Sequence, residues 1–263
     1  MTAPRLHDAE VDAAGRALAR WAGLSLGAGL KGTLRQAVDA AAHELGLTPA
    51  GLVAAAVGGD GPATEVLAEH AVVAETSFWR HAEGLLALAA RLSARPGPLR
   101  VWCAGCASGE EPYSLAVALL EAGRDMAADR LLATDLSLRA LARAQAGLYR
   151  ARALRRLPRE LAGRWFQASD GGARVDARAA APVAFQRHNL LDPPPPGPFD
   201  AVLCRNVLIY FEPEVARAVL LRLAAALAPG GLLLLGPVEL PLADGLGLEF
   251  LEERGATLLR RAG

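Results

Sequence analysis

Apolar residues recur at helical spacing through roughly the first 70 residues of the chain. In two runs, 11–21 and 34–45, they fall three or four positions apart, which places them on one face of a helix. Thr48 followed by Pro49 is typical of a helix start, because the threonine side chain caps the first turn and proline fits its first position. A breaker cluster at 58–62 separates one further helical stretch. The pattern predicts a small all-helical domain over residues 1–73.

From residue 74 onward the pattern changes to short apolar runs alternating with amphipathic stretches. Thr76 or Ser77 is the expected cap of a long helix that ends at the Pro-Gly-Pro of 96–98. The runs that follow predict strands at 99–104, 131–134, 183–186, 201–204 and 232–235, helices at 111–121, 138–146 and 212–227, and a closing antiparallel hairpin over 248–261. Short buried strands alternating with helices are typical of a parallel sheet covered on both faces. We therefore expect an α/β domain over 74–263, with an insert at about 147–182.

Composition narrows the possible classes of protein. With 263 residues of which 52% are hydrophobic, the chain can bury a sizeable core, so intrinsic disorder is excluded. The 28 basic and 28 acidic side chains balance, which argues against nucleic acid or an anionic membrane as the main partner. Three cysteines, no apolar run of membrane length and no export signal indicate a protein of the cytoplasm. We expect it to be a monomer without membrane insertion.

The zero net charge conceals an uneven distribution. Residues 1–70 carry five basic and eight acidic side chains, whereas 139–187 carry eleven arginines and three acids, a local charge of +8. Two interpretations of the arginines stay open. They form either a solvated surface or a docking face for an acidic protein.

One segment combines a buried strand, a Gly-x-x-x-Gly turn and a helix start: residues 101–114, Val-Trp-Cys-Ala-Gly-Cys-Ala-Ser-Gly-Glu-Glu-Pro-Tyr-Ser. It lacks the glycine spacing of a dinucleotide site and the Gly-Lys-Ser/Thr of a phosphate loop. Two acids after the second glycine would repel a pyrophosphate but suit a cationic ligand. Asp135, at the end of the next strand, can accept both hydroxyls of a ribose. These residues point to S-adenosylmethionine, with a purely structural turn as the alternative.

A second polar group follows another apolar strand. Arg205, Asn206 and Tyr210 come directly after the strand at 201–204, at the edge of a parallel sheet where ligands bind. Core packing does not explain an Arg-Asn pair at the end of an apolar strand. We expect this edge to belong to the same site as the glycine turn.

Taken together, these segments resemble the chemotaxis receptor glutamate methyltransferases of the CheR type. The resemblance covers about residues 70–240 and is carried by 76–80 (Thr-Ser-Phe-Trp-Arg), 105–114, 133–135 (Ala-Thr-Asp), 146–149 (Ala-Gly-Leu-Tyr), 189–191 (Asn-Leu-Leu) and 204–211 (Cys-Arg-Asn-Val-Leu-Ile-Tyr-Phe). It implies a class I methyltransferase fold, a Rossmann-like seven-stranded sheet with a small N-terminal helical domain and a short inserted subdomain.

The resemblance also implies the site and the reaction. The cofactor-binding residues would be Thr76, Arg80, Gly105, Glu111, Asp135, Asn189, Leu190, Cys204 and Arg205, with Arg80 and Tyr210 beside the transferred methyl group. The implied reaction forms glutamate methyl esters on the cytoplasmic domain of a chemoreceptor, with S-adenosylmethionine as methyl donor and no metal. The inserted subdomain grips a receptor tail in some members of the family.

Two departures from the family pattern matter. Ala74 stands where the family usually has asparagine, so one cofactor hydrogen bond is expected to be lost. The helical domain is net acidic where the family commonly offers a basic face, so the arginine-rich insert is the expected receptor contact. Charge reversal at Arg155, Arg156 and Arg159 is expected to weaken receptor methylation without changing cofactor affinity.

The implied methyl transfer requires the protein mainly to position the acceptor carboxylate and the cofactor. A glutamate side chain is ionised near pH 7, so no general base is needed, and Arg80 and Arg205 are candidates to hold carboxylates while Tyr210 donates a hydrogen bond. The Cys103–Cys106 spacing is interpreted as packing within the turn, not as a metal or redox site. Two alternative functions remain: a non-catalytic cofactor-binding regulatory module, supported only by Ala74, and methylation of a different acidic protein or a small acid.

Overall fold

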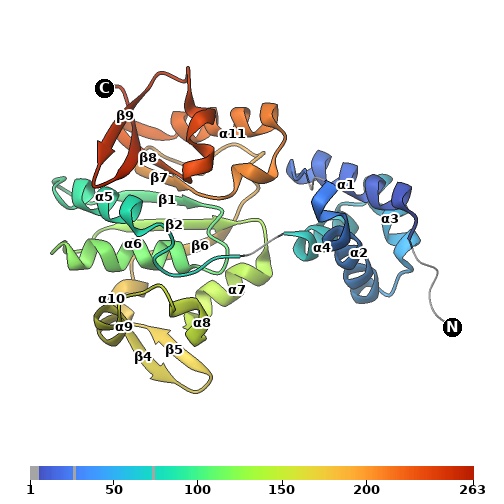
Figure 1. Ribbon diagram of the computed structural model, residues 1–263, viewed down its shortest axis with the longest axis horizontal. Coiled ribbons are helices and arrows are strands. Elements are labelled where there is room, and N and C mark those ends of the chain that lie inside the picture. Colours follow the sequence, from blue (N-terminus) through green and yellow to red (C-terminus); the bar gives the residue numbers. More distant parts are fainter. Residues whose placement is uncertain (1–5, 26–27, 73–74) are drawn as a thin grey trace. The chain divides into compact units, whose positions relative to one another are not determined.

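The computed structural model describes residues 6–25, 28–72 and 75–263. The chain divides into two compact units, the first made of 1–73 with 209–216 and the second of 74–208 with 217–263 (Figure 1). The short segment 209–216 therefore belongs with the helical unit, although the sequence assigned it to the larger domain.

Helices build the larger part of the first unit. They are α1 (Asp8–Ala22), the 3-10 turn η1 (Ala28–Leu30), α2 (Lys31–Leu45), α3 (Pro49–Val57) and α4 (Gly61–Ala71). Their apolar stripes meet in a core that includes Leu18, Val38 and Leu67, all fully buried. Thr48 caps α3 as expected, since its hydroxyl accepts the Gly51 N–H at 3.1 Å. Within the described ranges no single helix is long and apolar enough to span a membrane; only α2 and α3 as a pair, bent by 95°, meet such a test by length and composition.

A seven-stranded sheet forms the centre of the second unit, in the order β6-β2-β1-β7-β8-β10-β9. The first five of these pair in parallel, and β10 pairs antiparallel with both β8 and β9. The strands are β1 (Arg100–Ala104), β2 (Arg130–Asp135), β6 (Val183–Arg187), β7 (Phe199–Cys204), β8 (Leu227–Leu235), β9 (Leu248–Glu253) and β10 (Ala256–Arg261). The predicted seven-stranded sheet and its closing hairpin are confirmed.

Helices cover the sheet because both of its faces are apolar. The second unit contains α5 (Ala82–Ser93), α6 (Glu110–Glu121), α7 (Leu138–Ala146), the 3-10 turn η3 (Pro237–Ala243) and most of α11 (Pro213–Ala225), and the 3-10 turn η2 (Leu208–Tyr210) starts in it. Val101 and Cys103 share one buried cluster with residues of α5 and α6, while Trp102, on the opposite face, donates to the Thr134 hydroxyl at 2.9 Å. Alternate residues of β1 are thus buried on opposite faces.

The start of α5 corrects one expectation. The helix begins at Ala82, five or six residues after the expected cap, because residues 78–81 form a turn instead. Trp79 and His81 in this turn have positive φ angles of 59° and 48°, a region that a helix does not use. The turn therefore presents Arg80 from a loop and not from the first turn of a helix.

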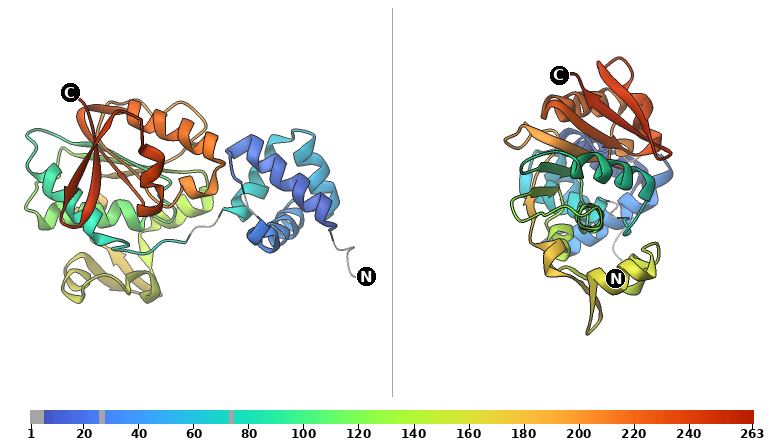
Figure 2. Two further views of the ribbon diagram at one scale, coloured as in Figure 1. Left: turned by 45° about the horizontal axis from the view of Figure 1, so that its top comes forward. Right: turned by 90° about the vertical axis from the view of Figure 1, so that its left-hand side faces the viewer.

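The insert forms a small sheet of its own, in the order β3-β5-β4. Its elements are β3 (Leu148–Tyr149), α8 (Ala151–Leu154), α9 (Arg159–Trp165), β4 (Phe166–Ser169), β5 (Gly172–Val175) and α10 (Ala177–Ala180). Figure 2 shows it on the opposite side of the main sheet from the C-terminal strands. Phe78 packs edge-on against Tyr149 and Phe166, with ring centroids 4.7 and 4.8 Å away, so the insert supports the turn that carries Arg80.

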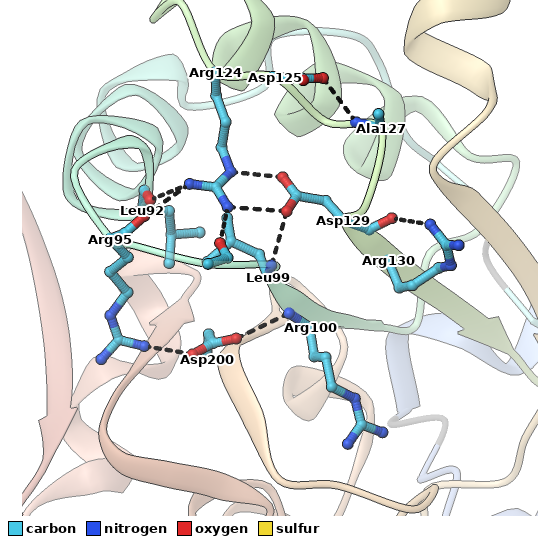
Figure 3. Close-up of polar contacts among 11 residues, drawn as sticks. Leu92, Arg95, Leu99, Arg100, Arg124, Asp125, Ala127, Asp129, Arg130 and Asp200 are labelled. Carbon is cyan, nitrogen blue, oxygen red and sulfur yellow. Dashed lines mark hydrogen bonds and ion pairs between the residues drawn. The ribbon is translucent and has the colours of Figure 1, made fainter.

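Buried charges close the sheet at the amino-terminal ends of its strands (Figure 3). The guanidinium of Arg124 donates to both oxygens of the Asp129 carboxylate, at 2.5 and 2.9 Å. Asp129, whose side chain is 1% exposed, also accepts the Leu99 N–H at 2.7 Å, just before β1. Asp200 in β7 joins Arg95 to the Arg100 N–H in the same way. This network fixes the edge of the sheet opposite to the predicted site.

Candidate functional site

Six of the ten predicted site residues lie at the carboxyl-terminal edge of the sheet. Strands β6, β2, β1 and β7 are neighbours and parallel, so their carboxyl ends lie side by side. Gly105 follows β1, Asp135 ends β2, Asn189 and Leu190 follow β6, Cys204 ends β7, and Arg205 follows it. Four separate stretches of sequence thus contribute to one edge.

The glycine turn between β1 and α6 needs glycine at both of its ends. Gly105 has a φ of +78°, and a Cβ added there would lie 2.5 Å from Cγ2 of Val207. Gly109 has a φ of +91°, and its Cβ would lie 2.8 Å from the Ala144 Cβ. Backbone conformation and space both exclude side chains at these positions. The turn therefore approaches the loop after β7 and the helix α7 more closely than other residues would allow.

Asp135 is coupled to this turn by hydrogen bonds. One carboxylate oxygen accepts the Ala107 N–H at 2.8 Å, and the other accepts the Ser137 N–H at 2.9 Å. The side chain is held in a fixed orientation as a result, at the position where this class of fold binds a ribose.

Arg205 links three parts of the site. Its side chain is 3% exposed, and Nη1 donates to the Glu111 carboxylate at 2.8 Å. Nη2 donates to the carbonyl oxygens of Arg80 at 2.7 Å and His81 at 3.2 Å. Burial raises the pKa of Glu111, and the charge of Arg205 opposes that shift. Arg205 therefore holds Glu111 and the turn of residues 78–81 in one arrangement.

The side chain of Arg80 lies on that turn and is partly exposed. Its Nη1 donates to the Glu75 carbonyl oxygen at 3.0 Å. Further bonds fix the turn itself: the Trp79 N–H donates to the Ser114 hydroxyl at 3.2 Å, and the Phe78 N–H donates to the Ala153 carbonyl at 3.1 Å. Backbone in sparsely populated φ regions persists only where its surroundings hold it. The insert, α6 and Arg205 all hold the turn that presents Arg80.

Glu239 is a further site residue that the sequence analysis missed. Its side chain is fully buried and accepts four backbone N–H groups at 2.8 Å each, from Gly236, Asn206, Val207 and Leu208. The carboxylate thereby ties the loop after β7 to the turn after β8. A signal exists in the sequence, because Glu239 is the only charged residue between Arg222 and Asp244, and a charge within an apolar stretch needs partners when buried.

The remaining predicted residues have the following places. Thr76 lines a cavity beside the insert, Asn189 accepts the Leu191 N–H at 3.0 Å through its side chain, and the Leu190 carbonyl accepts a bond from Arg222. Cys204 is buried at the end of β7. Tyr210 belongs to the first unit, where its carbonyl accepts the Ser25 N–H at 2.6 Å. Ala74 lies outside the described residues.

Burial favours the neutral forms of the cysteine thiols and of two histidines near the site. Burial raises the pKa of the Cys103, Cys106 and Cys204 thiols well above the ordinary value. Burial also lowers the pKa of His188, and burial together with the charge of Arg205 lowers that of His81. The described residues contain no cluster of three or more His, Cys, Asp or Glu that could hold a metal ion. Charge at this edge therefore resides on arginines and carboxylates.

These residues fit S-adenosylmethionine, the cofactor that the sequence resemblance implies. The glycine turn and the carboxylate of Asp135 lie together at the carboxyl-terminal edge, where this class of fold binds a nucleoside. Two buried nitrogen atoms, Arg205 Nε and His188 Nε2, have no hydrogen-bond partner within the part of the chain that the structure describes. Buried polar atoms are normally bonded, so unsatisfied atoms at this edge are consistent with a polar ligand beside them.

Comparison with known proteins agrees with this geometry. Residues 74–243 match the family described as "CheR methyltransferase, SAM binding domain". A "Chemotaxis protein methyltransferase" of Klebsiella aerogenes is 40% identical over 171 residues, which cover 62% of this chain and 59% of that protein. "Chemotaxis protein methyltransferase 1" of Pseudomonas aeruginosa is 45% identical over 149 residues, covering 54% of each chain. The "Probable biofilm formation methyltransferase WspC" of Pseudomonas putida is 37% identical over 193 residues, covering 70% of this chain and 46% of that protein.

Among solved structures, magnesium protoporphyrin IX methyltransferase from Synechocystis with bound S-adenosylmethionine is 18% identical, with a TM-score of 0.40 over 76% of this chain and 83% of that one. The chain spans less than two thirds of the length of each of the three relatives named above. The family match nevertheless covers well over half of the chain and includes every predicted cofactor residue. The chain therefore belongs to the CheR methyltransferase family, whose S-adenosylmethionine-binding domain it carries over residues 74–243.

Proposed function

We propose that this protein transfers the methyl group of S-adenosylmethionine to glutamate side chains on the cytoplasmic domain of a chemoreceptor, forming methyl esters. The observation that carries the proposal is the family match over the whole site, together with relatives that are named chemotaxis protein methyltransferases. A chemoreceptor substrate would place the protein in the cytoplasm, as the sequence also predicts.

The bound cofactor supplies a methyl group on a positively charged sulfur. A glutamate carboxylate oxygen forms the new bond to the methyl carbon, the carbon–sulfur bond breaks, and its electron pair stays on sulfur. No proton moves in this step. The neutral cysteines and histidines of the site therefore do not limit the reaction, because an ionised carboxylate needs no general base.

The protein's own contribution is positioning. Arg205 is held by Glu111 and by two backbone carbonyls, so its role is to support the turn of residues 78–81. Arg80, presented by that turn, would orient the acceptor carboxylate through charge-assisted hydrogen bonds. Tyr210 would donate a further hydrogen bond to the same carboxylate. Well-oriented groups react with effective molarities of about 10⁵–10⁸ M, so small displacements of these residues are costly.

Transfer of a labelled methyl group to a receptor cytoplasmic fragment tests the proposal. We expect the label to be released by mild base, as a carboxyl ester requires. Loss of one charge-assisted hydrogen bond costs about 1.5–3 kcal/mol, so Arg80→Ala should lower kcat by about ten- to a hundredfold. Tyr210→Phe would lose a hydrogen bond donated to the same ionised carboxylate, also worth about 1.5–3 kcal/mol, and should lower kcat by a similar factor.

Arg91→Ala is the matched control, because Arg91 lies on α5 and pairs with Glu253 away from the site. Wild-type kcat in Arg80→Ala or Tyr210→Phe would remove that residue from the catalytic role. Cofactor binding by calorimetry without any transfer would favour a regulatory module instead. A base-stable label would exclude a carboxyl ester.

A further inference from the structure

A cavity of about 620 Å³ lies between the insert and the glycine turn, entirely within the second unit. Four arginines line it: Arg143 from α7, Arg150 and Arg152 around the start of α8, and Arg155 after it. Its volume falls within the range of about 300–1,000 Å³ that is typical of ligand pockets.

The arginines of this cavity differ from others in the same insert. Arg164 pairs with Glu121, Arg174 donates to the Ala146 carbonyl, and Arg178 pairs with Asp176 and stacks on Trp165. By contrast, the side chains of the four arginines that line the cavity form no hydrogen bond or ion pair with any residue the structure describes, although the charge of Arg143 opposes the rise in the pKa of Glu110. Four arginine side chains are therefore available to a ligand beside this cavity.

The charge of the cavity is positive despite two acids in its wall. Four arginines line the cavity together with Glu75 and Glu110, which leaves a net charge of +2. Glu110 accepts a hydrogen bond from Ser108 at 2.8 Å, and burial raises the pKa of its carboxyl group. A concave surface with an excess of one charge concentrates ligands of the opposite charge. The cavity is suited to carboxylates, which guanidinium groups bind in bidentate fashion.

The position of the cavity connects it to the reaction. Ser108 belongs to the glycine turn that leads into α6, and Thr76 lies four residues before Arg80; both residues also line the cavity. A peptide segment in the cavity would therefore lie beside the cofactor turn. We propose that this arginine-lined cavity binds acidic side chains that flank the acceptor glutamate on the protein substrate. The proposal rests on the proposed function and names the feature of the substrate that the protein selects.

The cavity also refines the expectation from sequence. Arg155 lines it, whereas Arg156 and Arg159 do not. The variant Arg150→Gln/Arg152→Gln removes two charges from the cavity, and Arg156→Gln/Arg159→Gln removes two charges from the same insert outside it. All four side chains are exposed, so neither variant disturbs the core. Comparison of these two variants distinguishes specific binding in the cavity from a general effect of the positive charge of the insert.

Two synthetic peptides serve as methyl acceptors for the full chain: one with acidic residues on both sides of the acceptor glutamate, the other with glutamines at those positions. Exposed charge pairs contribute about 0.2–1 kcal/mol each, so the cavity variant should raise KM for the acidic peptide about two- to thirtyfold. Its KM for the glutamine peptide, its kcat and its affinity for S-adenosylmethionine should stay within twofold of wild type. The control variant should match wild type with both peptides.

A direct measurement of peptide binding tests the cavity independently of methyl transfer. A fluorescent acidic peptide with glutamine at the acceptor position cannot be methylated there, and its anisotropy reports binding alone. Weaker binding by the cavity variant but not by the control supports the cavity even if transfer to chemoreceptors fails. Equal losses in both variants, or equal binding of acidic and glutamine-flanked peptides, would overturn the proposal.

Discussion

Replacement of Glu239 by glutamine tests how the site is held together. The carboxylate accepts four backbone N–H groups, two on each oxygen: Oε1 from Val207 and Leu208, and Oε2 from Asn206 and Gly236. Glutamine has nearly the same shape, but only one of its two terminal groups accepts hydrogen bonds. The substitution therefore leaves one pair of N–H groups facing an amide nitrogen.

The magnitude follows from those two lost bonds. Hydrogen bonds to charged groups contribute about 1.5–3 kcal/mol each, so the loss before any relaxation is about 3–6 kcal/mol. Local relaxation and entry of water reduce this figure, and we expect Glu239→Gln to lower the free energy of unfolding by about 2–4 kcal/mol. Glu239→Ala would lose all four bonds, a cost comparable to the total stability of about 5–15 kcal/mol for a typical domain. Glutamine is therefore the informative substitution.

The same substitution should also weaken the binding of S-adenosylmethionine. Glu239 positions the backbone of Val207, and a Cβ on Gly105 would lie only 2.5 Å from a Val207 methyl group. Displacement of this loop changes the wall of the glycine turn. If about 1.4 kcal/mol of positioning energy is lost there, affinity for S-adenosylmethionine falls about tenfold.

Urea unfolding and calorimetry measure the two effects. Glu249→Gln is the matched control, because Glu249 is half-exposed and pairs with Arg260 on the surface, where such pairs contribute at most about 1 kcal/mol. The reasoning is refuted if Glu239→Gln is as stable as Glu249→Gln. It is also refuted if stability falls as expected but cofactor affinity is unchanged.

Other parts of the structure give three further predictions. Asp129→Asn breaks the buried pair with Arg124 and should cost about 3–5 kcal/mol of stability in thermal unfolding, without changing cofactor affinity at temperatures where the variant is folded; altered affinity would contradict the separation of the two sheet edges. Gly105→Ala should abolish S-adenosylmethionine binding in calorimetry, because the new Cβ meets Val207 and φ is +78°; wild-type affinity would contradict the tight turn. The rate of methyl transfer should not change between about pH 7 and 8.5. Burial lowers the pKa of His188 below its ordinary 6.5 and raises that of the thiols above 9.0, so none of these groups titrates in that range. A change in rate within the range would indicate that a protein group ionises during the reaction.

Much of the fold follows from local pattern. The alternation of apolar runs and amphipathic stretches predicts the parallel strands, and the hairpin of β9 and β10 is evident around Gly255. Gly105 and Asp135 are predictable for a related reason, since their positions at strand ends are set by the topology of the sheet. The local sequence pattern is therefore enough to predict a site residue whose position is set by the end of a strand.

The turn at residues 78–81 is not predictable in this way. Its backbone is held by Ser114, Ala153 and Arg205, which lie 35 to 125 positions away in the sequence. No local pattern records such contacts, and the apolar spacing of α5 extends misleadingly into the turn. The hydrogen bonds of Arg205 to Glu111 and to two backbone carbonyls were likewise not predictable from local pattern, whereas its predicted contact with a ligand stays a prediction.

The central claim is that this chain methylates glutamate side chains of a chemoreceptor, and mass spectrometry tests it most directly. A receptor cytoplasmic fragment is incubated with the full chain and S-adenosylmethionine, digested, and sequenced by fragmentation. The account predicts added methyl groups on glutamate side chains, lost after mild base, and far fewer of them with Arg80→Ala. Methyl groups on lysine, arginine or cysteine, or an unmodified receptor while the chain binds the cofactor, would contradict it.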